Sequence, residues 1–158
     1  MKKSKAILFL ITCSFIGAML ACGAPTQLVT INLNEDLADQ TLEEFAASFK
    51  GTNWTFLYDR VELKEDLMRV HGSFQNGGQP AVNGYLDSTF SVDDGSLQAD
   101  LLTADFGDFQ PAEADLLVLT DGIEQVFKDA IAGDKKAVLF VAVEMLEDLI
   151  KVQIRYLP

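Results

Sequence analysis

The chain has 158 residues, 49% of them hydrophobic, with 24 acidic and 12 basic side chains and a formal net charge of −12 at pH 7. This length and apolar content suffice for one domain with a core of its own. The acidic balance argues against binding nucleic acid, or anionic lipid headgroups through the protein surface, because both are negatively charged. A solvated acidic exterior is the simplest interpretation.

The first 21 residues are typical of an export signal. Three lysines precede an apolar run over residues 6–20, and the small residue Ala21 stands directly before Cys22. A positive segment, an apolar segment and a small-residue cleavage site together form a secretory signal. The apolar run falls short of the roughly 20 residues that a spanning helix needs. We therefore predict cleavage after residues 1–21, with an uncleaved anchor or cleavage elsewhere as alternatives.

The segment Met19–Cys22 also resembles the lipobox of bacterial lipoproteins. The resemblance implies that Cys22 becomes the first residue of the mature chain and carries a thioether diacylglycerol, often with an N-acyl chain such as palmitate. Two or more acyl chains give durable anchoring, whereas one gives only marginal binding. We expect a lipid-anchored protein on the extracytoplasmic face of a bacterial cell membrane, with residues 22–26 as a tether and 27–158 as a single domain.

The mature domain is expected to lack a disulfide. Of the two cysteines, Cys13 lies in the predicted signal and Cys22 is the predicted lipid attachment site. Although an exported protein can form disulfides, no pair of cysteines remains to form one. Packing must therefore provide the stability of the domain.

The domain begins with a predicted strand at 27–33 and a predicted helix from Glu35 to Phe49. Asn34 can cap this helix, and acidic residues in its first turn favour the helix dipole. From Trp54 onward the apolar residues recur every second position, and turn-forming residues interrupt the pattern. Four antiparallel strands joined by tight turns follow, at 54–63, 68–74, 82–92 and 97–101.

On the strand at 68–74 the alternation separates two faces. Met68 begins the apolar face, while Arg69, His71 and Ser73 share the other. A catalytic role for His71 would need a nucleophile held against the imidazole and an orienting carboxylate. The sequence contains no serine elbow motif, so we interpret His71 as an ordinary surface or cross-strand histidine.

A second amphipathic helix is predicted from Pro111 to Ile131, with acids that we interpret as a solvated exterior. The run at 138–145 is almost wholly apolar and predicts a strand covered on both faces. A last alternating strand follows at 150–156. The expected fold is α+β, in the order β-α-β-β-β-β-α-β-β. We expect about six to seven strands in one curved antiparallel sheet, with both helices on one face.

We expect neither an enzyme nor a cofactor or metal site. One histidine and no free thiol leave zinc without ligands, and the acid spacing of a calcium loop is absent. No glycine loop that would hold a phosphate precedes a helix. The Asp93-Asp94-Gly95 segment is interpreted as a hairpin turn.

The phenylalanines leave two hypotheses open. Most should form ordinary core, but an apolar groove between the sheet and the two helices could hold an acyl chain. The residues expected at this sheet–helix seam, and so the candidate ligand-binding residues, are Phe45, Phe49, Leu86, Phe90, Ile123 and Phe127. A continuous cavity along the seam would favour a lipid or other apolar ligand. Dense packing would favour a structural or protein-interaction module, whose partner the sequence does not identify.

The arrangement is similar to the LmeA-like and YpmS-like exported bacterial domains. The similarity rests on the opening strand and helix, Thr30–Leu37, on Arg60–Leu63 and Val92–Leu97, on the proline loop at Pro111 and on the closing hairpin 138–156. It implies a helix-on-curved-sheet architecture like that of tubular lipid-binding proteins. Lipid binding is accordingly an expectation by analogy, since a fold does not determine a function.

Overall fold

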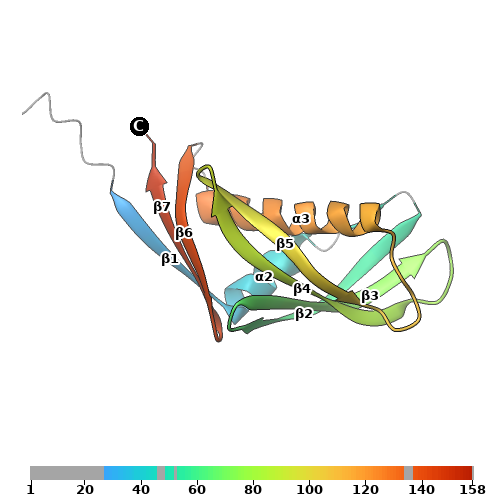
Figure 1. Ribbon diagram of the computed structural model, residues 1–158. Helices are drawn as coiled ribbons and strands as arrows, with labels where there is room; N and C mark the ends of the chain where they lie inside the picture. The colour runs from blue at the N-terminus through green and yellow to red at the C-terminus, as the bar shows by residue number, and fades with distance from the viewer. Residues whose placement is uncertain (1–26, 46–48, 52, 134–136, 158) are drawn as a thin grey trace, which may run out of the picture.

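The computed structural model describes residues 27–45, 49–51, 53–133 and 137–157. The predicted signal, Cys22 and the tether at 22–26 lie outside these ranges. The α+β class and the predicted order of elements are confirmed (Figure 1). The elements are β1 (Leu28–Asn34), α2 (Glu35–Phe45), β2 (Trp54–Lys64), β3 (Leu67–Asn76), β4 (Val82–Asp93), β5 (Ser96–Asp105), α3 (Glu113–Ala132), β6 (Val138–Leu146) and β7 (Leu149–Tyr156).

The seven strands form two open antiparallel sheets and not the single curved sheet that the sequence suggested. One sheet has the order β1-β7-β6 and the other β2-β3-β4-β5. Strands β4 and β6 lie beside each other but form no ladder. The backbone N–H of Phe140 donates to the carbonyl of Gly95 (2.9 Å), while the N–H of Phe90 donates to the sulfur of Met145 (3.4 Å). At Phe90 the methionine side chain, and not a strand backbone, accepts the hydrogen bond on this side.

The predicted tight turns are where the sequence placed them. Asp66, Asp94 and Asp148 have positive φ angles of 65°, 47° and 62° at the three hairpins β2–β3, β4–β5 and β6–β7. Aspartate tolerates this left-handed region better than most residues with a side chain. Turn chemistry therefore fixes the register of the strands on either side.

Both helices cover the buried face of the four-stranded sheet, and α3 runs along it in Figure 1. Leu42 of α2 is fully buried, and the ring of Phe127 on α3 packs against that of Phe90 with centroids 5.0 Å apart. The three-stranded sheet adds Val152 and Ile154 to the same core. Within the described ranges, neither helix combines the length and the apolar character needed to cross a membrane.

The structure corrects the predicted bounds of the first helix and the predicted cover of the strand at 138–145. Helix α2 is bounded by Glu35 and Phe45, and Phe49 lies outside it, where its carbonyl accepts a hydrogen bond from the N–H of Phe56 (2.9 Å). Strand β6 is not covered on both faces, since it lies at the edge of its sheet and Val141 is 40% exposed. A ladder irregularity between Phe140 and Ala142 turns Val141 outward.

Carboxylates of α2 cap the free edge of β2. Glu35 accepts a hydrogen bond from the N–H of Leu63 (3.1 Å), and Asp39 accepts a longer one from the N–H of Val61 (3.4 Å). Asp39 also accepts a hydrogen bond from the hydroxyl of Tyr58. Burial, and then Asp39, raises the pKa of this hydroxyl above its ordinary value. An exposed strand edge invites pairing with another chain, and these contacts occupy it.

A carboxylate of α3 caps the opposite edge in the same way. Glu124 accepts a hydrogen bond from the N–H of Ala99 on β5 (3.0 Å), and Lys128 pairs with the other oxygen of Glu124 (2.6 Å). Near the start of the helix, Asp115 accepts a hydrogen bond from the indole of Trp54 (2.6 Å). The prediction that all acids of this helix are merely solvated was therefore wrong for Glu124 and Asp115.

Candidate functional site

The predicted sheet–helix seam is packed core. Each of its five members with a described side chain is at most 6% exposed: Phe49 3%, Leu86 1%, Phe90 6%, Ile123 1% and Phe127 1%. The side chain of Phe45 lies outside the described residues. The structure places the other five in one continuous cluster of buried residues, where their own side chains fill the seam.

One small apolar hollow adjoins that core. It has a volume of about 240 Å³ and lies between α3 and the segment before β2. Of the five seam residues with a described side chain, only Phe49 lines it, together with Trp54, Val118, Leu119, Gly122, Gln125 and Val126. It is smaller than the roughly 300–1,000 Å³ of typical small-molecule sites.

A larger groove of about 520 Å³ crosses the outer face of the four-stranded sheet, opposite the helices. It lies over the middle of β2, β3 and β4. Cross-strand pairing places His71 beside Tyr85 and Ser73 beside Asn83. The lining residues are Leu57, Tyr58, Asp59, Arg60, His71, Gly72, Ser73, Asn83, Gly84 and Tyr85.

Two glycines form the floor of this groove. Gly72 and Gly84 are directly paired between β3 and β4. On the core side, a Cβ at Gly72 would lie 2.3 Å from the Phe56 ring, and one at Gly84 would lie 2.1 Å from the carbonyl oxygen of Asp105. The core therefore closes directly against the backbone here. Glycine inside a strand often marks such a close approach.

A β-bulge shapes one wall. The pairing of β2 with β3 shifts between Tyr58 and Arg60, so that Asp59 is an extra residue. Asp59 and Arg60 then lie side by side and form an ion pair of 2.8 Å. Bulges commonly redirect side chains in this way.

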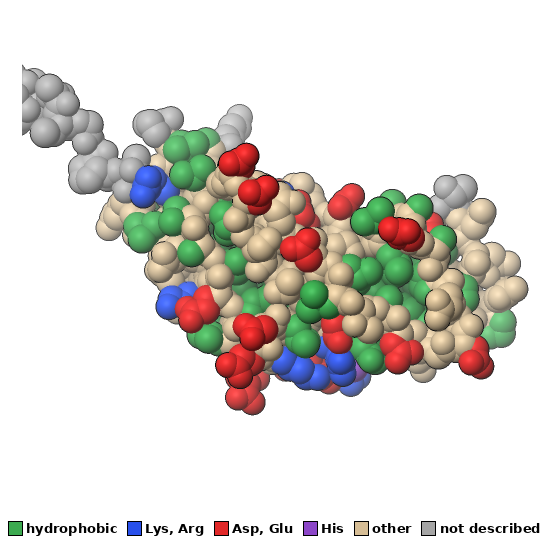
Figure 2. Space-filling view, viewed as in Figure 1, with side chains coloured by type: hydrophobic (Ala, Val, Ile, Leu, Met, Phe, Trp, Pro, Cys, Tyr) green, Lys and Arg blue, Asp and Glu red, His purple; other side chains and the backbone are tan. Residues whose placement is uncertain are grey.

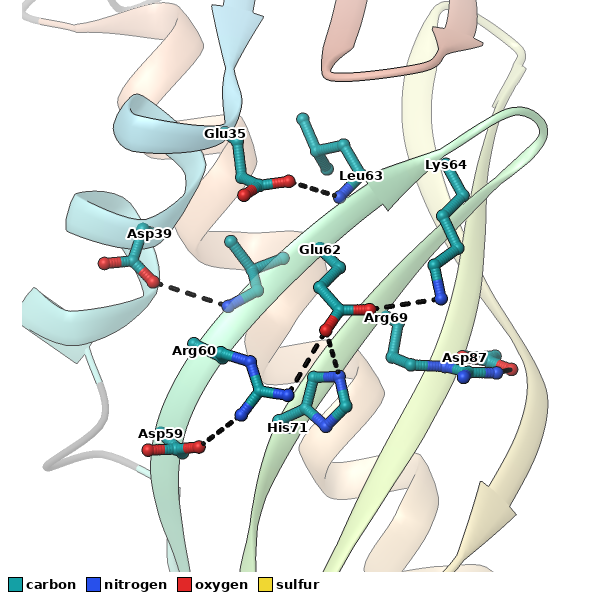
Figure 3. A network of polar contacts seen from close by, with 11 residues as sticks. Glu35, Asp39, Asp59, Arg60, Glu62, Leu63, Lys64, Arg69, His71 and Asp87 are labelled. Carbon is teal, nitrogen blue, oxygen red and sulfur yellow. Dashed lines mark hydrogen bonds and ion pairs between the residues drawn. The ribbon is translucent and has the colours of Figure 1, made fainter.

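An ionic network centred on Glu62 extends from the groove (Figure 3). Glu62 contacts Arg60 (3.2 Å), Lys64 (3.1 Å) and the Nε2 atom of His71 (3.0 Å). Lys64 first, and then His71 and Arg60, lower the pKa of Glu62 to about 2, against the opposing effect of burial. Figure 2 shows basic side chains gathered beside the purple histidine at the lower edge of the molecule.

Arg69 and Asp87 form a separate ion pair on this face. The guanidinium donates two hydrogen bonds of 2.7 Å to the two carboxylate oxygens, and Asp87 is only 7% exposed. This pairing raises the pKa of Arg69 above its ordinary value. The guanidinium also lies 3.9 Å from the ring centroid of Tyr85. Bidentate and stacked arginines hold their geometry tightly, so Tyr85 has a fixed position.

Three polar side chains of the groove have no hydrogen-bond partner within the described parts of the chain. No hydrogen bond joins the Ser73 hydroxyl, the Asn83 amide or the Tyr85 hydroxyl to another described side chain or backbone group. The Nε2 atom of His71 is buried and is poorly aligned for a hydrogen bond with Glu62. The Ser73, Asn83 and Tyr85 groups are therefore available to a ligand, whereas the buried Nε2 atom of His71 faces Glu62.

The surroundings of His71 are a glutamate and a tyrosine. His71 faces a tyrosine ring with centroids 6.2 Å apart and has Glu62 at its Nε2 atom. No aligned hydrogen bond joins its Nε2 to a serine or any other described residue, as activation of a nucleophile would require. Among the described residues, no three His, Cys, Asp or Glu side chains gather closely enough to hold a metal ion.

The sequence indicated part of this face. The period-two alternation placed Arg69, His71 and Ser73 together, and the structure confirms this. The groove itself was missed, because its shape depends on the bulge at Asp59 and on the pairing of Gly72 with Gly84. Gly72 and Gly84 inside predicted strands indicated bends or bulges of the sheet, but a single sequence has no signal for their pairing or for the bulge at Asp59. Comparisons with protein-family models, with curated proteins and with solved structures found no match to this chain.

Proposed function

We propose that this protein is a membrane-anchored, extracytoplasmic lipoprotein that is not an enzyme and acts as a binding module. The observation that carries this proposal is the contrast between the two faces of the four-stranded sheet. The inner face is filled by its own buried side chains, whereas the outer face carries a groove in which Ser73, Asn83 and Tyr85 have no hydrogen-bond partner among the described residues.

The place of β1 in the fold supports the same proposal. Strand β1 begins at Leu28, six residues after Cys22, and belongs to the three-stranded sheet. The groove lies on the other sheet. An acylated Cys22 would hold the protein at the membrane through the first sheet and leave the groove of the second sheet free to bind.

The anchor is tested by the intact mass of the full-length protein extracted from membranes of a bacterial host. We expect the mass of a chain that begins at Cys22 and carries a diacylglycerol, with or without an N-acyl chain. A Cys22→Ser variant should lose the lipid and leave the membrane fraction. A mature wild-type chain without lipid, or one that begins at another residue, contradicts the proposal.

The apolar hollow supports a second candidate function, the binding of an apolar ligand or lipid. It contains Phe49, one of the predicted seam residues, and its lining is almost wholly apolar. Substitution Gly122→Leu would fill it, because a Cβ there already lies 3.1 Å from the Phe49 ring. A lipid that copurifies with the wild type and is absent from Gly122→Leu would favour this candidate over the groove.

A further inference from the structure

The charges, hydrogen-bonding groups and apolar side chains of the groove on the outer face indicate which class of ligand it binds. We propose that it binds an uncharged oligosaccharide; this inference rests on the proposed binding function and adds the class of ligand.

Charge is the first argument. Arg60, which lines the groove, pairs with Asp59. Arg69, which lies next to the groove against Tyr85, pairs with Asp87. A phosphate or carboxylate ligand would have to compete with these acids, and a cation would meet the two arginines. An ion that broke the more buried Arg69–Asp87 pair would leave one partner uncompensated, which is costly. The Arg60–Asp59 pair is 54% and 66% exposed, so its loss would cost little. A neutral ligand avoids this cost.

Hydrogen-bonding capacity is the second argument. The Ser73 and Tyr85 hydroxyls can both donate and accept, and the Asn83 amide offers two donors and one acceptor group. None has a partner among the described residues. Sugar hydroxyls likewise donate and accept, so a glycan can satisfy all three. Tyr, Ser and Asn also combine rigid contact area with adaptable hydrogen bonding in other binding surfaces.

Apolar walls are the third argument. Leu57 is 48% exposed at one side of the groove, and the ring of Tyr85 is held in place by Arg69. The C–H faces of a sugar ring can pack against such surfaces while its hydroxyls reach the polar groups. An aromatic ring with a polar end suits this mixed contact.

The capped sheet edges disfavour an extended peptide. Peptides often bind by adding a strand to a free sheet edge. Here the N–H groups of Leu63 on β2 and Ala99 on β5 already donate to helix carboxylates. The central strand β3 is paired on both sides. A glycan needs no backbone partner and is therefore the better fit.

The test is saturation-transfer NMR on the full-length lipoprotein in nanodiscs, with chitohexaose and cellohexaose as neutral probes. We expect saturation transfer to at least one probe. The double variant Ser73→Ala/Tyr85→Phe removes two hydroxyls and keeps the aromatic ring, and it should weaken binding at least tenfold. The control Thr103→Ala lies on the same face outside the groove and should bind as the wild type does.

The inference is overturned if neither oligosaccharide receives saturation, or if the double variant binds as well as the wild type. Binding of a neutral Gly–Ser repeat peptide that requires Ser73 and Tyr85, without glycan binding, also overturns it but leaves the proposed binding function standing. Failure of the proposed function is recognised separately, by the mass of the mature chain and by any lipid that copurifies.

Discussion

Glu124 on α3 accepts a hydrogen bond of 3.0 Å from the backbone N–H of Ala99 on β5. This single contact couples a helix to the free edge of a sheet, and Glu35 does the same on the opposite edge. The helices thus contribute an apolar face to the core and carboxylates to the edges. Occupied edges keep a strand-rich protein from pairing with its own copies.

The variant Glu124→Ala should therefore be less stable and more prone to self-association. A hydrogen bond to a charged group contributes about 1.5–3 kcal/mol, and partial exposure of this carboxylate places the expected loss near the low end. Urea unfolding measures the loss, and sedimentation velocity measures association. Asp121→Ala removes an exposed acid from the same helix and should change neither. Equal behaviour of the two variants would show that the edge cap contributes nothing.

Gly72→Ala should destabilise the fold through overpacking. The added Cβ would lie 2.3 Å from the Phe56 ring and 2.6 Å from the carbonyl oxygen of Leu57. Overpacking of this kind typically costs about 1–3 kcal/mol. The neighbouring change Ser73→Ala faces the groove and should leave the denaturation midpoint unchanged. A Gly72→Ala protein as stable as the wild type would mean that Phe56 does not pack against this position.

Arg69→Lys should lower the unfolding free energy of the protein although it keeps the positive charge. Lysine cannot form the two parallel hydrogen bonds to Asp87 or stack on Tyr85 as a planar group. We expect a loss of about 1–2 kcal/mol, since charge-assisted hydrogen bonds exceed neutral ones. Thermal unfolding by circular dichroism measures it. Lys128→Arg, a reverse exchange in a helix ion pair, serves as the control and should cost less.

The lowered pKa of Glu62 predicts that the stability of the fold depends on pH. Its pKa is lowered to about 2 from an ordinary 4.5, chiefly by Lys64. A carboxyl with a lowered pKa stabilises the fold fully above its ordinary pKa, and the contribution disappears as the pH falls through the folded pKa. The difference in unfolding free energy between wild type and Glu62→Gln should thus shrink from about pH 4.5 to about pH 2.

The magnitude of this difference should be small. The Glu62 side chain is 33% exposed, and exposed ion pairs contribute about 0.2–1 kcal/mol. Urea unfolding at several pH values measures it, with Glu65→Gln as a control at an exposed acid nearby. A difference that stays constant down to pH 2, or that grows on acidification, would contradict the assigned network.

Local sequence patterns were sufficient for the order of elements and for one face of β3. Alternation placed Arg69, His71 and Ser73 together because side chains in a strand point to opposite faces in turn. The division into two sheets was not predictable, since it depends on how β4 and β6 meet, with contacts such as that of the Met145 sulfur with the N–H of Phe90. Contacts between residues far apart in the sequence leave no periodic signal.

The candidate site, too, could be predicted only in part from the sequence. The phenylalanine pattern predicted apolar faces correctly, but periodicity does not distinguish a filled core from a ligand cavity. The five described seam residues are buried against one another, while the groove depends on the extra residue Asp59 and a paired Gly72 and Gly84. Packing and register decide where open space remains, and both are tertiary properties.

The most direct test of the central claim is native mass spectrometry of the full-length lipoprotein, released from detergent after purification from bacterial membranes. The account predicts a chain beginning at Cys22 with its covalent lipid and no second lipid retained, because the protein interior is filled. A second lipid that survives detergent exchange, and is lost on denaturation, would contradict the account and establish an apolar ligand site.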